Sequence, residues 1–329
     1  MTSLVVIGNG FDIAHRLPTK YSDFMKFLKM LEKEPEYIMG NYVYAESISP
    51  HDRKKLQFYE EIIRYIPEDD LWNSFEEALG KLDHLQLQED NSYNLINYAA
   101  DDWSESANHD YQEMIAQDLS FISRMPQYFS EWIVGVNTCV SRCISQNIMS
   151  ENNLFLNFNY TDTLESTYSI PASKILYLHG NALHGDRLIL GHHDDSNFKE
   201  KPIPAFNTEE EWEEWEANLS DYDDDFREQE AREEIKSYFK KTYKNTALIV
   251  QENCGFFESL TQIEEVYILG HSLSVIDMDY FKAIKEAVLK NYKWYISYYS
   301  EQDYANAQKF VENLQIENFE FLTLSQLNE

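Results

Sequence analysis

The chain has 329 residues, of which 43% are hydrophobic and 15% aromatic, enough for a substantial buried core. Its 58 acidic and 27 basic residues give a formal net charge of −31, which repels phosphate backbones and anionic headgroups and argues against non-specific nucleic-acid binding. A small anionic ligand stays compatible with this charge, because backbone N–H groups bind anions without lysine or arginine.

The cysteines and the hydrophobic runs narrow the class of protein further. Three cysteines without a C-x-x-C pair predict neither a disulfide framework nor a zinc site. Cys139 and Cys143 lie four residues apart in a helical pattern, which favours packing in the core over metal or redox use. The N-terminus lacks a signal-peptide layout, and no run is as long as a membrane span. We therefore expect a cytoplasmic protein with no metal and no membrane partner.

Short runs rich in β-branched and aromatic residues predict the strands of a parallel sheet. Most of these runs are continuous rather than alternating, which is typical of strands covered on both faces. They lie at residues 3–8, 153–158, 174–179, 187–190, 265–270, 293–299 and 318–324. Helical patterns at 278–290 and 302–314 separate the last three, so the C-terminal part predicts a β-α-β-α-β unit. The expected fold is α/β, with a Rossmann-like parallel sheet in a single domain over residues 1–329.

Two long segments interrupt the strands. From about residue 30 to 150 the chain is mostly helical in pattern, notably at 54–66, 72–84 and about 109–147, so we expect a helical insertion between the first and second strands. A second, acidic insert spans about 196–245. Between Thr208 and Glu234, aromatic residues recur every three to four positions among Asp and Glu, which predicts an amphipathic acidic helix or lid.

The first predicted strand ends in a turn of the phosphate-binding type, Gly8-Asn9-Gly10, followed by Asp12. A dehydrogenase fingerprint has a third glycine where this chain has Ile13, and it needs a second strand soon afterwards to carry an acid. An ordinary dehydrogenase is therefore disfavoured, although the turn's amides can still face a pyrophosphate or ribose. A tight turn without any ligand is the alternative.

Three other predicted strands also end in polar residues. FLNFNYTDTLE supplies Asn159, Tyr160 and Asp162; LYLHG supplies His179 and Gly180; VYILGHS supplies Gly270, His271 and Ser272, with Asp277 a few residues later. Because the carboxyl ends of parallel strands form the ligand crevice of an open sheet, we expect these residues to converge on one site.

The order of these motifs resembles a known family. GNGFD, LPTKYSDF, WNSFEEAL, NFNYTDTLE, LHGN, LILGHH and ILGHSLSVIDMDYF follow one another as in the AbiH family of bacteriophage abortive-infection proteins. The resemblance spans nearly the whole chain, and Arg16 stands where family members tend to have glycine. It implies a role in antiphage defence, with a homo-oligomer or a phage protein as possible partners.

The same motifs are more distantly similar to the sirtuin-like NAD-binding domains of antiphage proteins. Those domains carry a Gly-rich turn, N-Y-D-x-x-x-E, H-G and G-x-S-x-x-x-D; this chain has Thr161-Asp162 where they place Asp directly after Tyr. It also lacks the four-cysteine zinc module of deacetylating sirtuins. The resemblance therefore implies NAD as ligand or substrate, and cleavage of NAD rather than deacetylation.

Cleaving the nicotinamide–ribose bond passes through an oxocarbenium-like transition state, and this assigns expected roles. Asn159 would position water, His179 would accept a proton from a ribose hydroxyl, and Asp12 or Glu76 would support the ribose or the departing amide. The expected binding residues are Gly8, Asn9, Gly10, Phe11, Tyr160, Asp162, Gly180, Gly270, His271, Ser272 and Asp277.

Each of these side chains also has a purely structural interpretation. Asn159 can bond neighbouring backbone, and His179 can be a satisfied buried histidine. Asp162 with Glu165, and separately Asp277, can serve as N-cap or first-turn acids of helices. Two function classes therefore stay open: an enzyme that cleaves NAD, and a nucleotide-binding sensor or scaffold without turnover.

Overall fold

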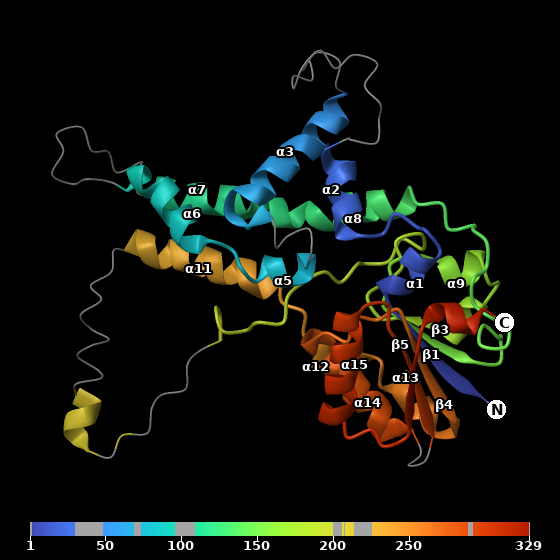
Figure 1. Ribbon diagram of the computed structural model, residues 1–329. Helices are drawn as coiled ribbons and strands as arrows, with labels where there is room; N and C mark the ends of the chain where they lie inside the picture. The colour runs from blue at the N-terminus through green and yellow to red at the C-terminus, as the bar shows by residue number, and fades with distance from the viewer. Residues whose placement is uncertain are drawn as a thin grey trace, which may run out of the picture. The chain divides into compact units, whose positions relative to one another are not determined.

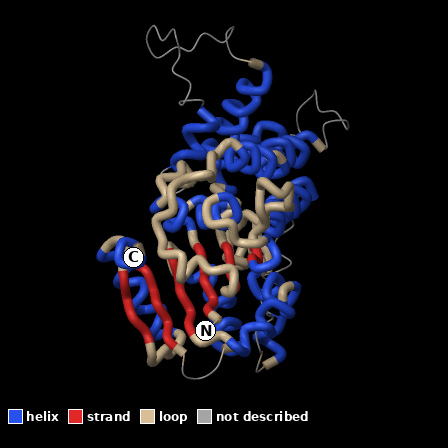
Figure 2. Tube along the Cα trace, turned by 90° about the vertical axis from the view of Figure 1, so that its right-hand side faces the viewer, coloured by secondary structure: helices blue, strands red, loops and turns tan. Residues whose placement is uncertain are grey.

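Six strands form one sheet in the computed structural model, in the order β3-β2-β1-β4-β5-β6, and every neighbouring pair is parallel. Figure 1 labels β1, β3, β4 and β5 of this sheet. Figure 2 shows the strands of the sheet side by side. Their bounds are β1 Ser3–Ile7, β2 Leu154–Asn157, β3 Ile175–Tyr177, β4 Glu265–Leu269, β5 Lys293–Ser297 and β6 Phe319–Leu322. The predicted α/β architecture with a Rossmann-like parallel sheet is confirmed.

The structure describes residues 2–29, 49–68, 74–95, 109–199, 206, 208–213, 226–288 and 292–328. The chain divides into two compact units. The sheet unit comprises Met1–Leu56, Met125–His193 and Lys244–Glu329, and the helical unit comprises Gln57–Arg124 and Asp194–Tyr243.

Alternation along the strands gives the sheet two apolar faces. On β1, the fully buried Leu4 and Val6 belong to one core cluster, and Val5 and Ile7 belong to another. The first cluster includes the apolar sides of the C-terminal helices, and the second includes Phe11 and the segment around residues 144–149. Because both faces are covered, the strands read as continuous apolar runs.

The helices of the sheet unit are α1 Asn9–Ala14, α2 Tyr21–Lys29, α8 Met125–Val134, α9 Thr163–Ser166, α12 Thr246–Glu252, α13 Cys254–Glu258, α14 Met278–Ala287 and α15 Glu301–Asn313. Short 3₁₀ turns lie at η4 Ala172–Lys174, η5 Ser259–Gln262, η6 Val275–Asp277 and η7 Leu324–Leu327. Ser300 begins α15 with a capping box, because its hydroxyl accepts the Asp303 N–H while the Asp303 carboxylate accepts from Ser300. The predicted C-terminal β-α-β-α-β unit is therefore confirmed as β4-α14-β5-α15-β6.

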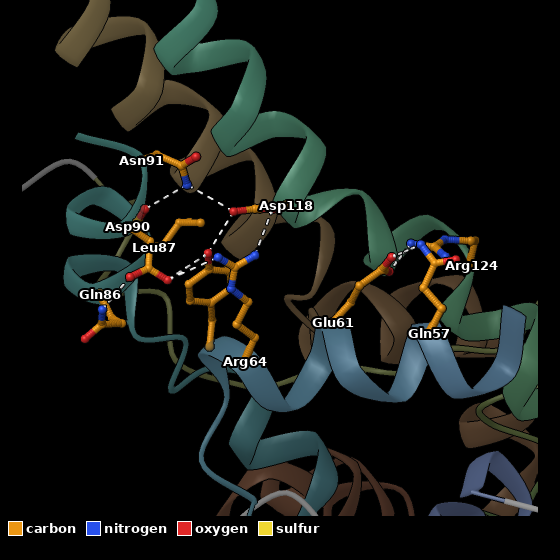
Figure 3. Close-up of polar contacts among 10 residues, drawn as sticks. Gln57, Glu61, Arg64, Gln86, Leu87, Asp90, Asn91, Asp118 and Arg124 are labelled. Carbon is orange, nitrogen blue, oxygen red and sulfur yellow. Dashed lines mark hydrogen bonds and ion pairs between the residues drawn. The ribbon is translucent and has the colours of Figure 1, made fainter. Parts of the chain in front are cut away.

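The helical unit contains α5 Phe75–Leu79, α6 His84–Asn91, η1 Ser92–Asn94, α7 Asp110–Asp118, η3 Leu119–Ser123 and α11 Phe226–Lys241. Helix α3, Pro50–Tyr65, crosses the division between the units. Polar side chains join its end to α6 and α7. The Tyr65 hydroxyl donates to Asp118 at 2.7 Å. Asn91 Nδ2 donates to the same carboxylate at 3.0 Å (Figure 3). Burial and the Asp118 carboxylate raise the pKa of Tyr65, so this phenol stays a donor.

The long helix predicted at 109–147 is wrong in its second half. The chain forms α7, η3 and α8, and α8 ends at Val134 before Gly135; residues 136–150 form no helix. This stretch is rich in Asn, Thr, Ser and Cys, which have low helix propensity. Cys139 and Cys143 therefore share no helical face. Cys139 is exposed, which contradicts core packing, and Cys143 is half-buried with its Sγ 3.2 Å from His15 Nε2.

Three more predictions of local structure differ from the structure or lie partly outside its described residues. Residues 187–190 form no strand, because this stretch hydrogen-bonds to the loops after β2 and β3: Ile189 N–H donates to the His179 carbonyl at 3.0 Å. Of the helix predicted at 72–84, residues 72 and 73 lie outside the described part, and within 74–83 only α5 is helical. Of the acidic segment between Thr208 and Glu234, residues 214–225 lie outside the described part. No helix in that described part is long and apolar enough to cross a membrane.

Candidate functional site

The turn after β1 packs directly against the loop after β4. Gly10 N–H donates to the Gly270 carbonyl at 2.7 Å. A Cβ on Gly10 would lie 2.8 Å from that carbonyl oxygen, and one on Gly270 would lie 2.1 Å from Phe11 N. Gly270 also has φ +65°, a conformation that favours glycine. Contact between two backbones therefore explains these glycines, with or without a ligand.

Asp12 is buried on α1, one turn beyond the glycines, with 1% of its surface exposed. Its Oδ2 accepts a hydrogen bond of 2.6 Å from Thr161 Oγ1, and Thr161 lies just after β2. Burial raises the pKa of Asp12 to about 6, although the Thr161, Thr163 and Asn159 side chains oppose the rise. Asp12 is thus a buried carboxyl that is mostly ionised at pH 7. Among the described residues, no cationic side chain forms an ion pair with it.

Asn159 connects the end of β2 to the turn after β1. Its Nδ2 donates to the Gly8 carbonyl at 3.2 Å, and its backbone N–H donates to Asn157 Oδ1 at 3.0 Å. The structural interpretation of Asn159 as a partner for neighbouring backbone is therefore correct for its Nδ2. The Asn159 side chain nevertheless lies close enough to Asp12 to lower the pKa of that carboxyl.

His179 follows β3 and is 3% exposed. One ring nitrogen bonds to the Phe158 carbonyl, while Nε2 is buried and has no hydrogen-bond partner among the described residues. A carbonyl only accepts, so the nitrogen facing it, Nδ1, carries the proton and Nε2 presents a lone pair. Burial, with a smaller contribution from Lys244, holds the pKa of His179 well below its ordinary value. The interpretation of His179 as a fully satisfied buried histidine is therefore wrong.

Phe158, which follows β2, contacts residues that follow β3 and β4. Its carbonyl bonds to His179, its ring centroid lies 4.4 Å from that of His271, and Asn159 is the next residue. On the loop after β4, His271 Nε2 lies 3.5 Å from Asp277 Oδ2. Polar residues from four strand ends, Asp12, Asn159, His179 and His271, thus belong to one connected group.

A family model described as "Bacteriophage abortive infection AbiH" matches residues 4–298 of the chain. The chain belongs to the AbiH family. No curated protein and no solved structure matches it significantly.

Two acids of the AbiH motifs differ from their predicted capping roles. Asp277 precedes α14 but makes no side-chain cap hydrogen bond; its carboxylate faces His271 and Lys244 instead. Asp162 precedes α9 likewise without a cap bond from its side chain, and its carboxylate accepts from Thr138 Oγ1 at 2.5 Å. Glu165 does lie in the first turn of α9, as expected.

The other predicted residues of the AbiH motifs have diverse surroundings. Asn9 is exposed and donates to the Thr19 carbonyl; Phe11 is buried against His15 and Tyr168; the Tyr160 hydroxyl donates to the Ile189 carbonyl. Gly180 has φ +84°, and Ser272 is exposed. Glu76 belongs to the helical unit, so its predicted role stays a prediction.

Sequence reasoning missed two residues of this AbiH site. Thr161, the donor to Asp12, lies inside the quoted motif NFNYTDTLE and could have been noticed there. Lys244 lies outside every motif, yet its side chain is 0% exposed and its Nζ is 3.4 Å from Asp277 Oδ1. No periodicity marks a buried lysine in a connecting loop. In the described part of the chain, no group of three His, Cys, Asp or Glu side chains is arranged to hold a metal.

Proposed function

We propose that this AbiH protein is an antiphage effector that binds NAD at the carboxyl edge of its sheet and cleaves the bond between nicotinamide and ribose. The observation that carries the proposal is His179 Nε2, a buried acceptor with no hydrogen-bond partner among the described residues. Buried polar atoms are nearly always hydrogen-bonded, so an unpartnered acceptor at the mouth of a parallel sheet favours a ligand that brings a donor. A ribose hydroxyl is such a donor.

The Asp12 carboxylate supports cleavage through its charge. Breaking the N-glycosidic bond sends the bonding electrons to nicotinamide and leaves positive charge on the ribose, and water then adds to C1′ with loss of a proton. Asp12 is a buried carboxylate that no cationic side chain of the described residues pairs with, so positive charge that develops near it is stabilised. His179 Nε2 would orient the ribose hydroxyl, and Asn159 would position the water.

Binding without turnover is the second candidate, and one observation favours it. Because burial lowers the pKa of His179 well below its ordinary value, the imidazole is a good hydrogen-bond acceptor but a weak proton acceptor at pH 7. A sensor needs only the first property.

The deciding experiment measures free nicotinamide and NAD affinity for the purified protein. If the protein cleaves NAD, His179→Ala and Asn159→Ala should each lose about 10² to 10⁴ in rate while the fold survives. His184→Ala is the matched control, because His184 follows the same strand but is partly exposed and paired with Glu165. Tight NAD binding without nicotinamide release, also in infected-cell extract, would favour the sensor. Equal cleavage by wild type and both variants would refute the mechanism.

A further inference from the structure

Lys244 is a buried lysine that the proposed reaction does not use. It lies in the loop between α11 and α12, where its backbone N–H donates to the His192 carbonyl at 2.7 Å. Its side chain is 0% exposed, and its Nζ lies 3.4 Å from Asp277 Oδ1. Burying an ammonium costs free energy unless a carboxylate lies beside it. Removing either Lys244 or Asp277 would therefore leave the other charge buried and unpaired, which would destabilise the fold.

Two histidines complete the buried group around this pair. His271 Nδ1 accepts the Leu273 N–H at 2.9 Å, so its proton is on Nε2, which faces Asp277 Oδ2 at 3.5 Å. His179 has the opposite tautomer, with Nδ1 bonded to the Phe158 carbonyl. The Phe158 ring contacts both in edge-to-face geometry, at centroid distances of 5.4 Å from His179 and 4.4 Å from His271.

Lys244 and Asp277 are charged side chains that act on both histidines, and His271 also acts on His179. The phenols of Tyr160 and Tyr280 are further titratable neighbours, with rings 6.0 and 6.1 Å from that of His179. Burial and Lys244 lower the pKa of both histidines, whereas Asp277 raises it. Burial raises the pKa of Asp277, but Lys244, His271 and His179 together more than offset this, and the net pKa is lowered.

We propose that Lys244 is a positioning residue: paired with Asp277, its ammonium takes the one positive charge that this buried group holds, so that His179 and His271 stay neutral in fixed tautomers. A protonated His271 would place a proton on Nδ1, against the Leu273 N–H, and would break that bond. Leu273 has φ +56°, a costly conformation for a residue with a side chain, so the loop depends on its local hydrogen bonds.

The consequence for the ligand rests on the proposed function. His179 can accept a hydrogen bond from a ribose hydroxyl only while Nε2 is unprotonated. A charged His179 would donate from both nitrogens and would repel the positive charge that develops on the ribose. Lys244 would thus act on the reaction through the protonation state of His179, without touching the ligand.

Imidazole nitrogen NMR on the full-length, ¹⁵N-histidine-labelled protein tests this inference. In the wild type at pH 7, His179 should be neutral with its proton on Nδ1, and His271 neutral with its proton on Nε2. In Lys244→Met, one of the two should hold an extra proton at pH 7, with its titration midpoint moved up by at least about one pH unit. In Lys244→Met/Asp277→Leu, which removes both charges, both histidines should be neutral again. His184 serves as the internal reference, because it pairs with Glu165 and its ring nitrogen signals should be the same in all three proteins.

Either of two results would overturn the proposal: a charged His179 or His271 in the wild type at pH 7, or two neutral histidines in a folded Lys244→Met. If Lys244→Met does not fold, Lys244→Gln, which also removes the ammonium, is measured in its place with the same expected and overturning results. These spectra need no activity, so a wild type that releases no nicotinamide refutes the proposed function and leaves the charge assignment of Lys244 intact.

Discussion

Replacing Asp12 by asparagine should make the protein more stable at neutral pH. The folded state raises the pKa of this buried carboxyl from 3.8 to about 6, so the folded protein holds the proton more tightly than the unfolded chain. Below pH 3.8 the carboxyl is neutral in both states and burial costs no charge. As the pH rises from there to about 6, the unfolded chain ionises first and the folded state loses stability.

The size of the effect follows from that difference. About two pH units at 1.36 kcal/mol each give a cost of about 3 kcal/mol above pH 6, of which about half is already present at pH 5. Asparagine removes the titration but keeps an oxygen that can accept the 2.6 Å hydrogen bond from Thr161. We therefore expect Asp12→Asn to gain about 1 to 3 kcal/mol at pH 7.5 and less at pH 5.

Denaturant unfolding of both proteins at several pH values between 5 and 8 measures this difference. Asp277→Asn is the control and should have the opposite effect, a loss of stability at neutral pH. The pKa of Asp277 is lowered in the fold, so its charge stabilises the folded state at neutral pH. Removing that charge leaves Lys244 buried without its carboxylate. An Asp12→Asn protein that is less stable than wild type at pH 7.5, or equally shifted at pH 5 and 7.5, would refute the reasoning. A gain in stability with loss of NAD cleavage would fit a carboxylate retained for function.

Three further substitutions test the fold around the site. Arg16 has φ +63°, so Arg16→Gly should stabilise by about 0.5 to 1 kcal/mol in thermal or chemical unfolding, and a loss would mean that the arginine side chain matters more than its backbone. Gly270→Ala should lose more than about 3 kcal/mol or fail to fold, because its Cβ would lie 2.1 Å from Phe11 N; a well-folded variant would contradict the tight loop contact. Tyr65→Phe should lower the free energy of unfolding by about 1 to 3 kcal/mol, because it loses the hydrogen bond to Asp118. Tyr93→Phe, at an exposed ring, should change the free energy of unfolding by less than about 0.5 kcal/mol. Equal effects would show that the polar contacts around Asp118 in Figure 3 contribute nothing.

The amino-acid sequence by itself determined the class of fold and the residues at the carboxyl edge of the sheet. Continuous apolar runs such as Leu4–Ile7 predict strands covered on both faces, and helices between the last three runs leave only parallel connections. Asp12, Asn159, His179 and His271 each follow such a run, so their meeting at one edge follows from the topology of a parallel sheet. These are local patterns, and local patterns are readable without a structure.

Tertiary contacts decided which of those residues face one another and in what state. Cys139 and Cys143 keep helical spacing, yet the chain around them is not helical because packing along the sheet outweighs a weak propensity. Asp277 precedes a helix, yet its carboxylate compensates Lys244, which lies 33 residues away in the chain. Protonation depends on burial and on charges brought together from distant segments, and neither has a period or a motif. For that reason the surroundings of His179 Nε2 and the pairing of Lys244 with Asp277 can be read only from the folded chain.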